Sequence, residues 1–212
     1  MTTNISDLTI PDSALAAQVT ELVRDTAGEL LYNHSSRVFL FGAFRGHARA
    51  LSFDRELLYV GAMFHDMGLT AAHRDSQQRF EIDGAEDAAA FLRQHGIDEE
   101  SVRLVWQAIA LHTTPEIPYH MRPEVALVTT GVEADVLGIG LADIPASTRD
   151  AIVAAHPRPD FKRRILAAFT EGIAHRPDTT FGNIKADVLE RYVPGFHRGN
   201  FVDVVLQSDW PE

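Results

Sequence analysis

Apolar residues recur along most of the chain at spacings of three and four positions, which places them on one face of an α-helix. The pattern predicts amphipathic helices over residues 13–31, 35–50, 54–66, 83–94, 98–111, 124–137, 147–155, 161–174 and 184–192. Polar residues from Thr70 to Arg79 indicate a loop, and three prolines between Thr113 and Pro123 exclude a continuous helix there. No segment alternates apolar and polar residues with a period of two, so we expect no β-sheet.

This density of helices indicates an all-α protein with one hydrophobic core. We expect residues 13–145 to form a helical bundle and residues 146–212 to form a helical extension packed on the same domain. The tail from Arg176 to Glu212 could instead be loosely attached, although it carries more aromatic side chains than a disordered tail usually does. It would cover a pocket or join two copies of the chain, so a homo-oligomer is one expectation.

Charge and composition narrow the classes of partner. The chain has 19 basic and 30 acidic residues, a net charge of −11, which argues against binding nucleic acid or an anionic membrane through bulk electrostatics. It has no cysteine, so disulfides, thiolate zinc sites and cysteine nucleophiles are excluded. The polar start of the chain lacks the layout of a signal peptide, and charges interrupt every long apolar run. We therefore expect a cytoplasmic protein with neither a membrane nor a nucleic-acid partner.

Four residues carry the candidate chemistry: His34, the adjacent pair His65 and Asp66, and Asp135. Imidazole and carboxylate groups hold divalent first-row metals and leave positions open for water and substrate. A single histidine on an amphipathic helix is more often structural than a ligand. Asp135, however, lies in an otherwise apolar segment, where an unpaired carboxylate would be costly to bury and a metal would satisfy it.

The order His, His-Asp, Asp on predicted helices resembles the HD-domain superfamily of metal-dependent hydrolases over roughly residues 15 to 145. Three stretches are similar to the cyanamide hydratase branch of that superfamily: residues 33–38, 63–70 and 79–85. The resemblance implies one divalent ion held by four residues. These are His34, His65, Asp66 and Asp135. Zn²⁺ is the first expectation for the ion, with Fe²⁺, Mn²⁺, Co²⁺ and Ni²⁺ as alternatives.

Two departures from the superfamily pattern narrow the expected activity. Many phosphodiesterase members have a phosphate-holding lysine where this chain has Leu69. Binuclear members have a histidine just ahead of a Gly-Ala-Glu helix, and the residues before Gly84 include none. A second metal ion and two-metal phosphodiester cleavage are therefore not expected.

Three residues are candidates for moving protons near the metal: Asp66, Glu81 and His112. Asp66 would act both as ligand and as the group that orients water, a role that the resemblance implies. Glu81 could equally interact with the dipole of the helix that follows it, and His112 could cap helical carbonyls. Arg37 shares a helix face with His34 and could orient a carboxylate such as Asp66, although a surface ion pair is the more ordinary interpretation.

The leading hypothesis is a mononuclear enzyme that adds metal-activated water to a small molecule such as cyanamide or a nitrile. The first alternative is a phosphohydrolase acting on a nucleotide or another phosphomonoester, in which Arg37 and Arg79 would grip the phosphate. The second alternative is a degenerate module of the same superfamily that binds a ligand without catalysis.

Overall fold

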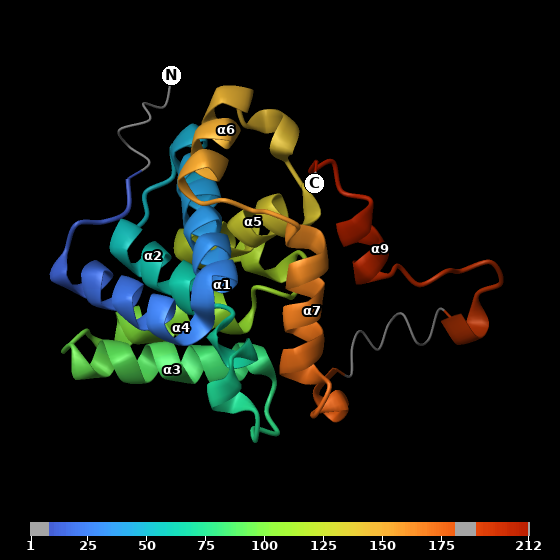
Figure 1. The fold of residues 1–212 in the computed structure, drawn as a ribbon, viewed down its shortest axis with the longest axis horizontal. Coiled ribbons are helices and arrows are strands. Elements are labelled where there is room, and N and C mark those ends of the chain that lie inside the picture. The colour runs from blue at the N-terminus through green and yellow to red at the C-terminus, as the bar shows by residue number, and fades with distance from the viewer. Residues whose placement is uncertain (1–8, 181–189, 212) are drawn as a thin grey trace.

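The described part of the chain is helical and contains no β-strand (Figure 1). It comprises residues 9–180 and 190–211 of a computed structural model. The helices are α1 Ala14–Ala48, α2 Arg55–Phe64, α3 Phe80–Gln94, α4 Glu99–Ala110, α5 Pro123–Val132, α6 Ala146–Ala155, α7 Phe161–Ile173 and α9 Phe201–Leu206. Short 3₁₀ turns and one π-helical turn connect some of them. The predicted all-α class is confirmed.

Helix α1 is the central element of the fold, and its course differs from the prediction. The sequence predicted two helices separated at residues 32–34, whereas α1 is one long helix with a kink at Gly28. Gly28 has φ 73° and ψ 178°, a conformation that glycine reaches without the cost a Cβ would add. Every residue from 31 to 44 is buried. Because this half of α1 is surrounded on all sides, polar residues on it enter the core.

Helices α2 and α5 pack against α1, and α3 and α4 pack against each other and against α2. Asp54 caps α2 by accepting hydrogen bonds from the amides of Glu56 and Leu57 at 2.8 and 3.0 Å. The close approach of α5 to α1 depends on Gly131. A Cβ there would lie 2.1 Å from the carbonyl oxygen of Val38. Helix α3 begins at Phe80, three residues before the predicted start at residue 83, so Glu81 belongs to its first turn.

The predicted helix over residues 124–137 is two elements. Helix α5 ends at Val132 and a π-helical turn, η5 Glu133–Leu137, follows it. Gly138 ends this turn in the left-handed conformation, with φ 72°. A π-turn inserts an extra residue into a helix, is uncommon and is often found at functional sites. Here it carries Asp135 into the core.

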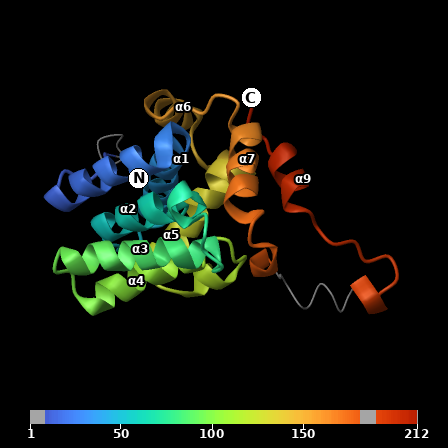
Figure 2. The same ribbon diagram turned by 60° about the horizontal axis from the view of Figure 1, so that its bottom comes forward.

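The C-terminal region packs on the bundle. Views from two directions place α7 between the α1–α5 bundle and α9 (Figures 1 and 2). A second apolar cluster joins α1, the π-turn, α7 and α9 through Leu31, Val136, Phe161, Ile165 and Val205. These contacts attach α9 to the rest of the fold, and the assignment of residues 146–212 to the same domain stays a prediction. Residues 184–189 of the predicted helix 184–192 lie outside the described residues, and the boundary near residue 145 stays a prediction.

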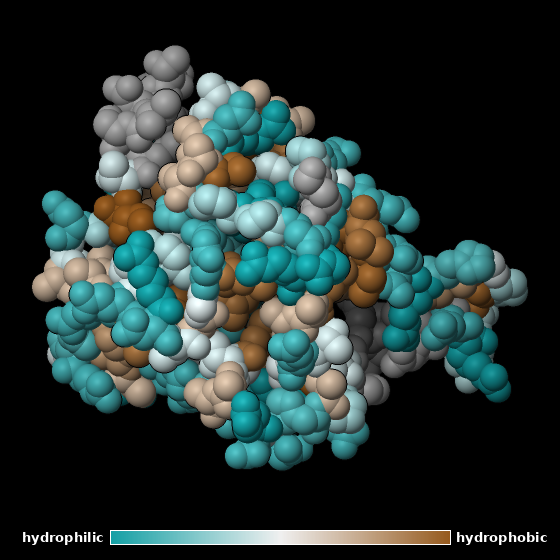
Figure 3. Space-filling model, viewed as in Figure 1, coloured by the Kyte–Doolittle hydropathy of each residue, from teal (hydrophilic) through white to brown (hydrophobic). Residues whose placement is uncertain are grey.

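The face shown in Figure 3 is mainly hydrophilic, with small apolar patches separated by polar side chains. This is the surface expected when amphipathic helices turn their apolar sides inward. Within the described residues, every helix is too short or too polar to cross a membrane.

Candidate metal centre

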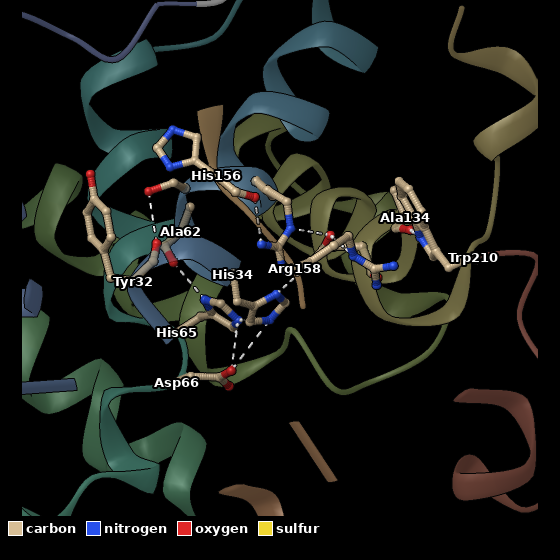
Figure 4. A network of polar contacts seen from close by, with 12 residues as sticks. Tyr32, His34, Ala62, His65, Asp66, Ala134, His156, Arg158 and Trp210 are labelled. Atoms are coloured by element: carbon tan, nitrogen blue, oxygen red, sulfur yellow. Dashed lines mark hydrogen bonds and ion pairs between the residues drawn. The ribbon is translucent and has the colours of Figure 1, made fainter. Parts of the chain in front are cut away.

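His34, His65 and Asp66 meet in the core of the bundle (Figure 4). His34 comes from the buried half of α1, His65 ends α2, and Asp66 precedes the 3₁₀ turn η2 Met67–Leu69. One potential ligand atom from each residue lies within 4.8 Å of the others. The Nε2 atoms of the two histidines are 3.1 Å apart, and they lie 3.5 and 3.3 Å from Oδ2 of Asp66. Three residues from separate elements are thus close enough to share one ion.

A hydrogen bond at Nδ1 fixes the orientation of each of three imidazole rings, those of His34, His65 and His112. Nδ1 of His65 donates to the carbonyl oxygen of Ala62 at 2.6 Å, and Nδ1 of His112 donates to that of Ile109 at 2.6 Å. Nδ1 of His34 lies 2.7 Å from the carboxylate of Asp135. Because the Nδ1 atoms are anchored in this way, the Nε2 atoms are left as the ligand positions.

His112, at the end of α4, joins the same group. Its ring centre is 4.9 Å from that of His65, and its Nε2 atom is 3.7 Å from Oδ1 of Asp66. Both carboxylate oxygens of Asp66 and Nε2 of His112 are buried without a hydrogen-bond partner in the described structure. Leaving such atoms unsatisfied is costly. A divalent ion would satisfy them, and the donor set of imidazole and carboxylate fits such an ion.

Asp135 is held differently from the other three predicted ligands. The Nε and Nη2 atoms of Arg37 donate to its two carboxylate oxygens at 2.7 and 2.8 Å, and His34 takes the remaining side of Oδ2. Arg37 and Asp135 are both 0% exposed. The sequence suggested that the carboxylate of Asp135 would be unpaired without a metal. The structure shows instead that it is paired with Arg37. Arg37 makes a buried pair with Asp135, so the interpretation as a surface ion pair is wrong. Arg37 does hold one of the predicted ligand carboxylates, but that carboxylate is Asp135 and not the example of Asp66.

Comparison with known proteins decides the family. The family model for the HD domain matches residues 31–155, more than half of the chain. The chain belongs to the HD-domain family. It is thereby a member of a superfamily of metal-dependent hydrolases, as the resemblance implied. No curated protein matches it, and the assignment to the cyanamide hydratase branch stays a prediction.

Burial and mutual charge set the protonation of this HD centre. Burial alone would raise the pKa of Asp66, but the neighbouring imidazoles, led by His65, hold it below its usual range. Burial would lower the pKa of His65, and the charge of Asp66 raises it instead. Burial, followed by repulsion from His65, lowers the pKa of His112 to about 4. The HD aspartate is thus ionised near neutral pH, and His112 is neutral there.

Glu81 lies at the edge of the centre rather than in it. It is buried in the first turn of α3, and its carboxylate accepts hydrogen bonds from Nη2 of Arg79 at 2.7 Å and from Oγ1 of Thr113 at 2.5 Å. Thr113 directly follows His112 in the chain, so its hydrogen bond to Glu81 brings two predicted proton carriers, Glu81 and His112, near each other. Burial would raise the pKa of Glu81, but the bonds from Arg79 and Thr113 lower it, and the group is ionised at neutral pH. The catalytic roles of Asp66, Glu81 and His112 stay predictions.

Sequence reasoning did not single out the residues that cover the HD centre from the C-terminal side. The ring of Phe161, at the start of α7, lies 5.4 Å from that of His34, and the guanidinium of Arg37 lies 4.8 Å above the Phe161 ring. Further along α7, a Cβ on Gly172 would lie 2.7 Å from Cδ2 of Leu69. Helix periodicity marked α7 as amphipathic, but no local pattern showed which part of the core its apolar face would cover.

Proposed function

We propose that this HD domain uses one divalent metal ion to add water to a small, uncharged molecule, such as cyanamide or a simple nitrile. The observation that carries the proposal is the set of buried, unsatisfied atoms on Asp66 and His112, next to two imidazole Nε2 atoms. A site with these properties has a defined place for a cation and contains little room for a large substrate, because the four side chains around it are buried.

His34, His65 and Asp66 would hold the ion, and Zn²⁺ is the first candidate among the divalent metals. Asp135, the fourth predicted ligand, is bonded to Arg37 and His34, so its role as a ligand stays a prediction. When bound, such an ion would supply Lewis acidity and lower the pKa of a coordinated water to about 7. The protein would supply the orientation. Asp66 is ionised, so either of its oxygens would accept a hydrogen bond from a water at the site.

His112 would direct water rather than store protons. Its Nδ1 atom donates to the carbonyl oxygen of Ile109, so Nε2 carries the lone pair and would accept a hydrogen bond from a water on the side that faces Asp66. A pKa of about 4 makes it a weak base at neutral pH. Glu81 is ionised and held by hydrogen bonds from Arg79 and Thr113, and it remains the first candidate to take a proton.

The charges around the site favour an uncharged substrate over a phosphate ester. The two arginines that could grip a phosphate are committed to carboxylates, Arg37 to Asp135 and Arg79 to Glu81. Leu69, at the place of the phosphate-holding lysine, is packed under α7 at Gly172. A phosphomonoester would have to take its counter-charge from the metal alone or break these pairs. This counts against the phosphohydrolase alternative.

Elemental analysis of the purified protein, followed by a substrate panel, tests the proposal. We expect about one equivalent of metal per chain. We also expect urea from cyanamide, or the amide from a simple nitrile, and no phosphate from nucleoside monophosphates. His65→Ala should lose metal and activity together, and His120→Ala, which removes an exposed imidazole, should keep both.

Each remaining outcome counts against the proposal in a different way. Release of phosphate without hydration of any nitrile would show that the protein is a phosphohydrolase. Metal below about half an equivalent, even after incubation with Zn²⁺, would leave only a ligand-binding module. Full activity in chelated protein would refute the metal-dependent mechanism itself.

A further inference from the structure

The π-helical turn that carries Asp135 is held by side chains from outside the matched HD region. At the end of a helix the last main-chain carbonyls need partners from elsewhere. The carbonyl oxygen of Ala134 accepts a hydrogen bond from Nε1 of Trp210 at 2.7 Å. The carbonyl oxygen of Asp135 accepts one from Nη2 of Arg158 at 3.0 Å. Both donors lie beyond residue 155, where the match to the family model ends.

We propose that Trp210 and Arg158 are positioning residues of the metal centre, which hold the turn so that Asp135 fixes His34. The idea rests on the proposed function, because it assigns these two residues to that same site. It makes the C-terminal segment a working part of the centre rather than a cover over it.

Trp210 and Arg158 form a single packed unit. The guanidinium of Arg158 lies 4.2 Å from the centre of the Trp210 ring and 4.6 Å from that of the Phe161 ring. The Trp210 ring also lies 6.0 Å from that of Phe41, and only 7% of its surface is exposed. Contact with two aromatic rings restricts the guanidinium of Arg158, and this favours one direction for its hydrogen bond to the carbonyl oxygen of Asp135.

The segment that ends in Trp210 is itself seated on the fold. Val205 of α9 is buried in the apolar cluster it shares with Phe161 of α7. Nζ of Lys162 donates to the carbonyl oxygens of Leu206 and Ser208, at 3.5 and 3.3 Å. These contacts fix the backbone of residues 205–208, which directly precede Trp210.

The contacts form a continuous path from Trp210 to the ligand atoms. Figure 4 shows Trp210 and Ala134 at one end of the network, and His65 and Asp66 at the other. Between them, the carboxylate of Asp135 accepts the Nδ1 proton of His34, because an ionised carboxylate can only accept. That bond turns Nε2 of His34 toward His65 and Asp66. If the turn shifts, the anchor of His34 shifts with it.

Trp210→Phe separates positioning from simple packing, since it keeps an aromatic ring for Arg158 and removes the N–H that holds Ala134. Trp106→Phe is the matched control. It makes the same change at the other tryptophan, whose Nε1 donates to Glu86 at the exposed surface. Full-length proteins are compared, and the affinity for Zn²⁺ is measured by competition with a chelator. We expect Trp210→Phe to bind Zn²⁺ about 10- to 100-fold more weakly than wild type, as for other residues that orient metal ligands. Trp106→Phe should bind it like wild type.

A second readout needs no metal. In chelated protein the Nδ1 proton of His34 is observed by nuclear magnetic resonance, and its exchange with solvent should be about tenfold faster in Trp210→Phe and unchanged in Trp106→Phe. If Trp210→Phe does not fold, a different measurement is made on the Trp106→Phe protein. Trp210 is its one remaining tryptophan, so its fluorescence reports on Trp210 alone. That emission should change as Zn²⁺ is added and level off once the metal site is full.

The two proposals fail in different ways. Equal Zn²⁺ affinity in wild type and Trp210→Phe would overturn the positioning role and leave the proposed function intact. A wild-type protein that binds no Zn²⁺ would overturn the proposed function, and with it the role of Trp210 toward a metal. An unchanged exchange rate of the His34 proton, or in the replacement experiment an unchanged Trp210 emission, would refute the path from Trp210 to His34.

Discussion

Replacing Arg37 with methionine should destabilise the protein strongly, because it strands a buried carboxylate. Arg37 and Asp135 are both 0% exposed, and two charge-assisted hydrogen bonds join them. Removing one partner of such a buried pair costs about 3–5 kcal/mol of unfolding free energy. Arg37 also donates to the carbonyl oxygens of His156 and Pro157, at 3.0 and 3.1 Å, so we expect the upper part of this range.

The size of the loss should depend on pH, and the sign follows from Asp135. In the wild-type fold, burial would raise the pKa of Asp135, but Arg37 and His34 lower it below its usual value. The ionised form of Asp135 therefore stabilises the wild-type fold at pH values above the pKa of an aspartate in the unfolded chain. This contribution is lost as the pH falls through the lower pKa that Asp135 has in the folded protein. Without Arg37, burial dominates and raises the pKa, so the variant becomes less stable as the pH rises. The difference between the two proteins should be larger at about pH 7 than at about pH 4.5.

Urea unfolding in the presence of a chelator, at both pH values, measures this difference without a contribution from bound metal. Arg93→Met is the matched control, because Arg93 also pairs with a carboxylate through two nitrogens, that of Glu99, but at the exposed surface. It should leave the unfolding free energy unchanged. The double variant Arg37→Met, Asp135→Asn should recover most of the loss, since no unpaired carboxylate then remains at position 135. A loss below about 1 kcal/mol at pH 7, or one that does not vary with pH, would contradict the reasoning.

Three further predictions concern the site and its cover. His65→Ala should abolish metal binding while circular dichroism shows unchanged helix content, and an equivalent of tightly bound metal in the variant would exclude His65 as a ligand. Glu81→Gln should lower kcat on the substrate found by the panel by about 100-fold or more while metal content stays the same, and wild-type kcat would remove Glu81 from catalysis. Gly172→Ala places a Cβ 2.9 Å from Cα of Leu69, so thermal unfolding should show a loss of about 1–3 kcal/mol. Gly199→Ala, with open space around it, is the control, and equal stability of the two variants would mean that α7 does not press on the HD motif.

The sequence was sufficient to identify the part of the centre that depends on local order. His65 and Asp66 are adjacent and follow an apolar helix, so their place at its inner end could be predicted from spacing alone. The helix boundaries were accurate where a cap marks them, as at Asp54 and Asp98. The start of α3 was missed by three residues, because Arg79 offers no side-chain cap that would mark it.

The remaining differences arise where burial removes the helical pattern. The second half of α1 is buried on all sides, so apolar and polar positions no longer alternate with the helical period, and the helix seemed to break at 32–34. The real change of direction lies at Gly28, where the backbone has a positive φ. The π-turn of Asp135 is similarly hidden, because one inserted residue in an apolar segment leaves no mark on its composition.

Long-range pairs could not be predicted from spacing at all. Arg37 and Asp135 are 98 residues apart, and nothing near either of them names the other as partner. The aromatic residues near the C-terminus signalled an ordered tail, but the acceptor of Trp210, 76 residues away in the π-turn, is a main-chain carbonyl that no side-chain pattern reveals. Such contacts are set by the tertiary packing of α1, α7 and the turn.

Two buried carboxylates, those of Asp66 and Asp135, lie against the same imidazole, His34, and the protein balances their charges by different means. Asp135 has a permanent counter-charge, because a guanidinium keeps its proton at any ordinary pH. Asp66 faces only imidazoles, whose charge depends on a proton, and both its oxygens lack a hydrogen bond in the described structure. A fold that needed both carboxylates only for stability would gain from treating Asp66 as it treats Asp135. A buried Asp66 with no permanent counter-charge is costly for stability. A cation bound at its two free oxygens would offset this cost, and this is the physical reason for locating the metal beside Asp66.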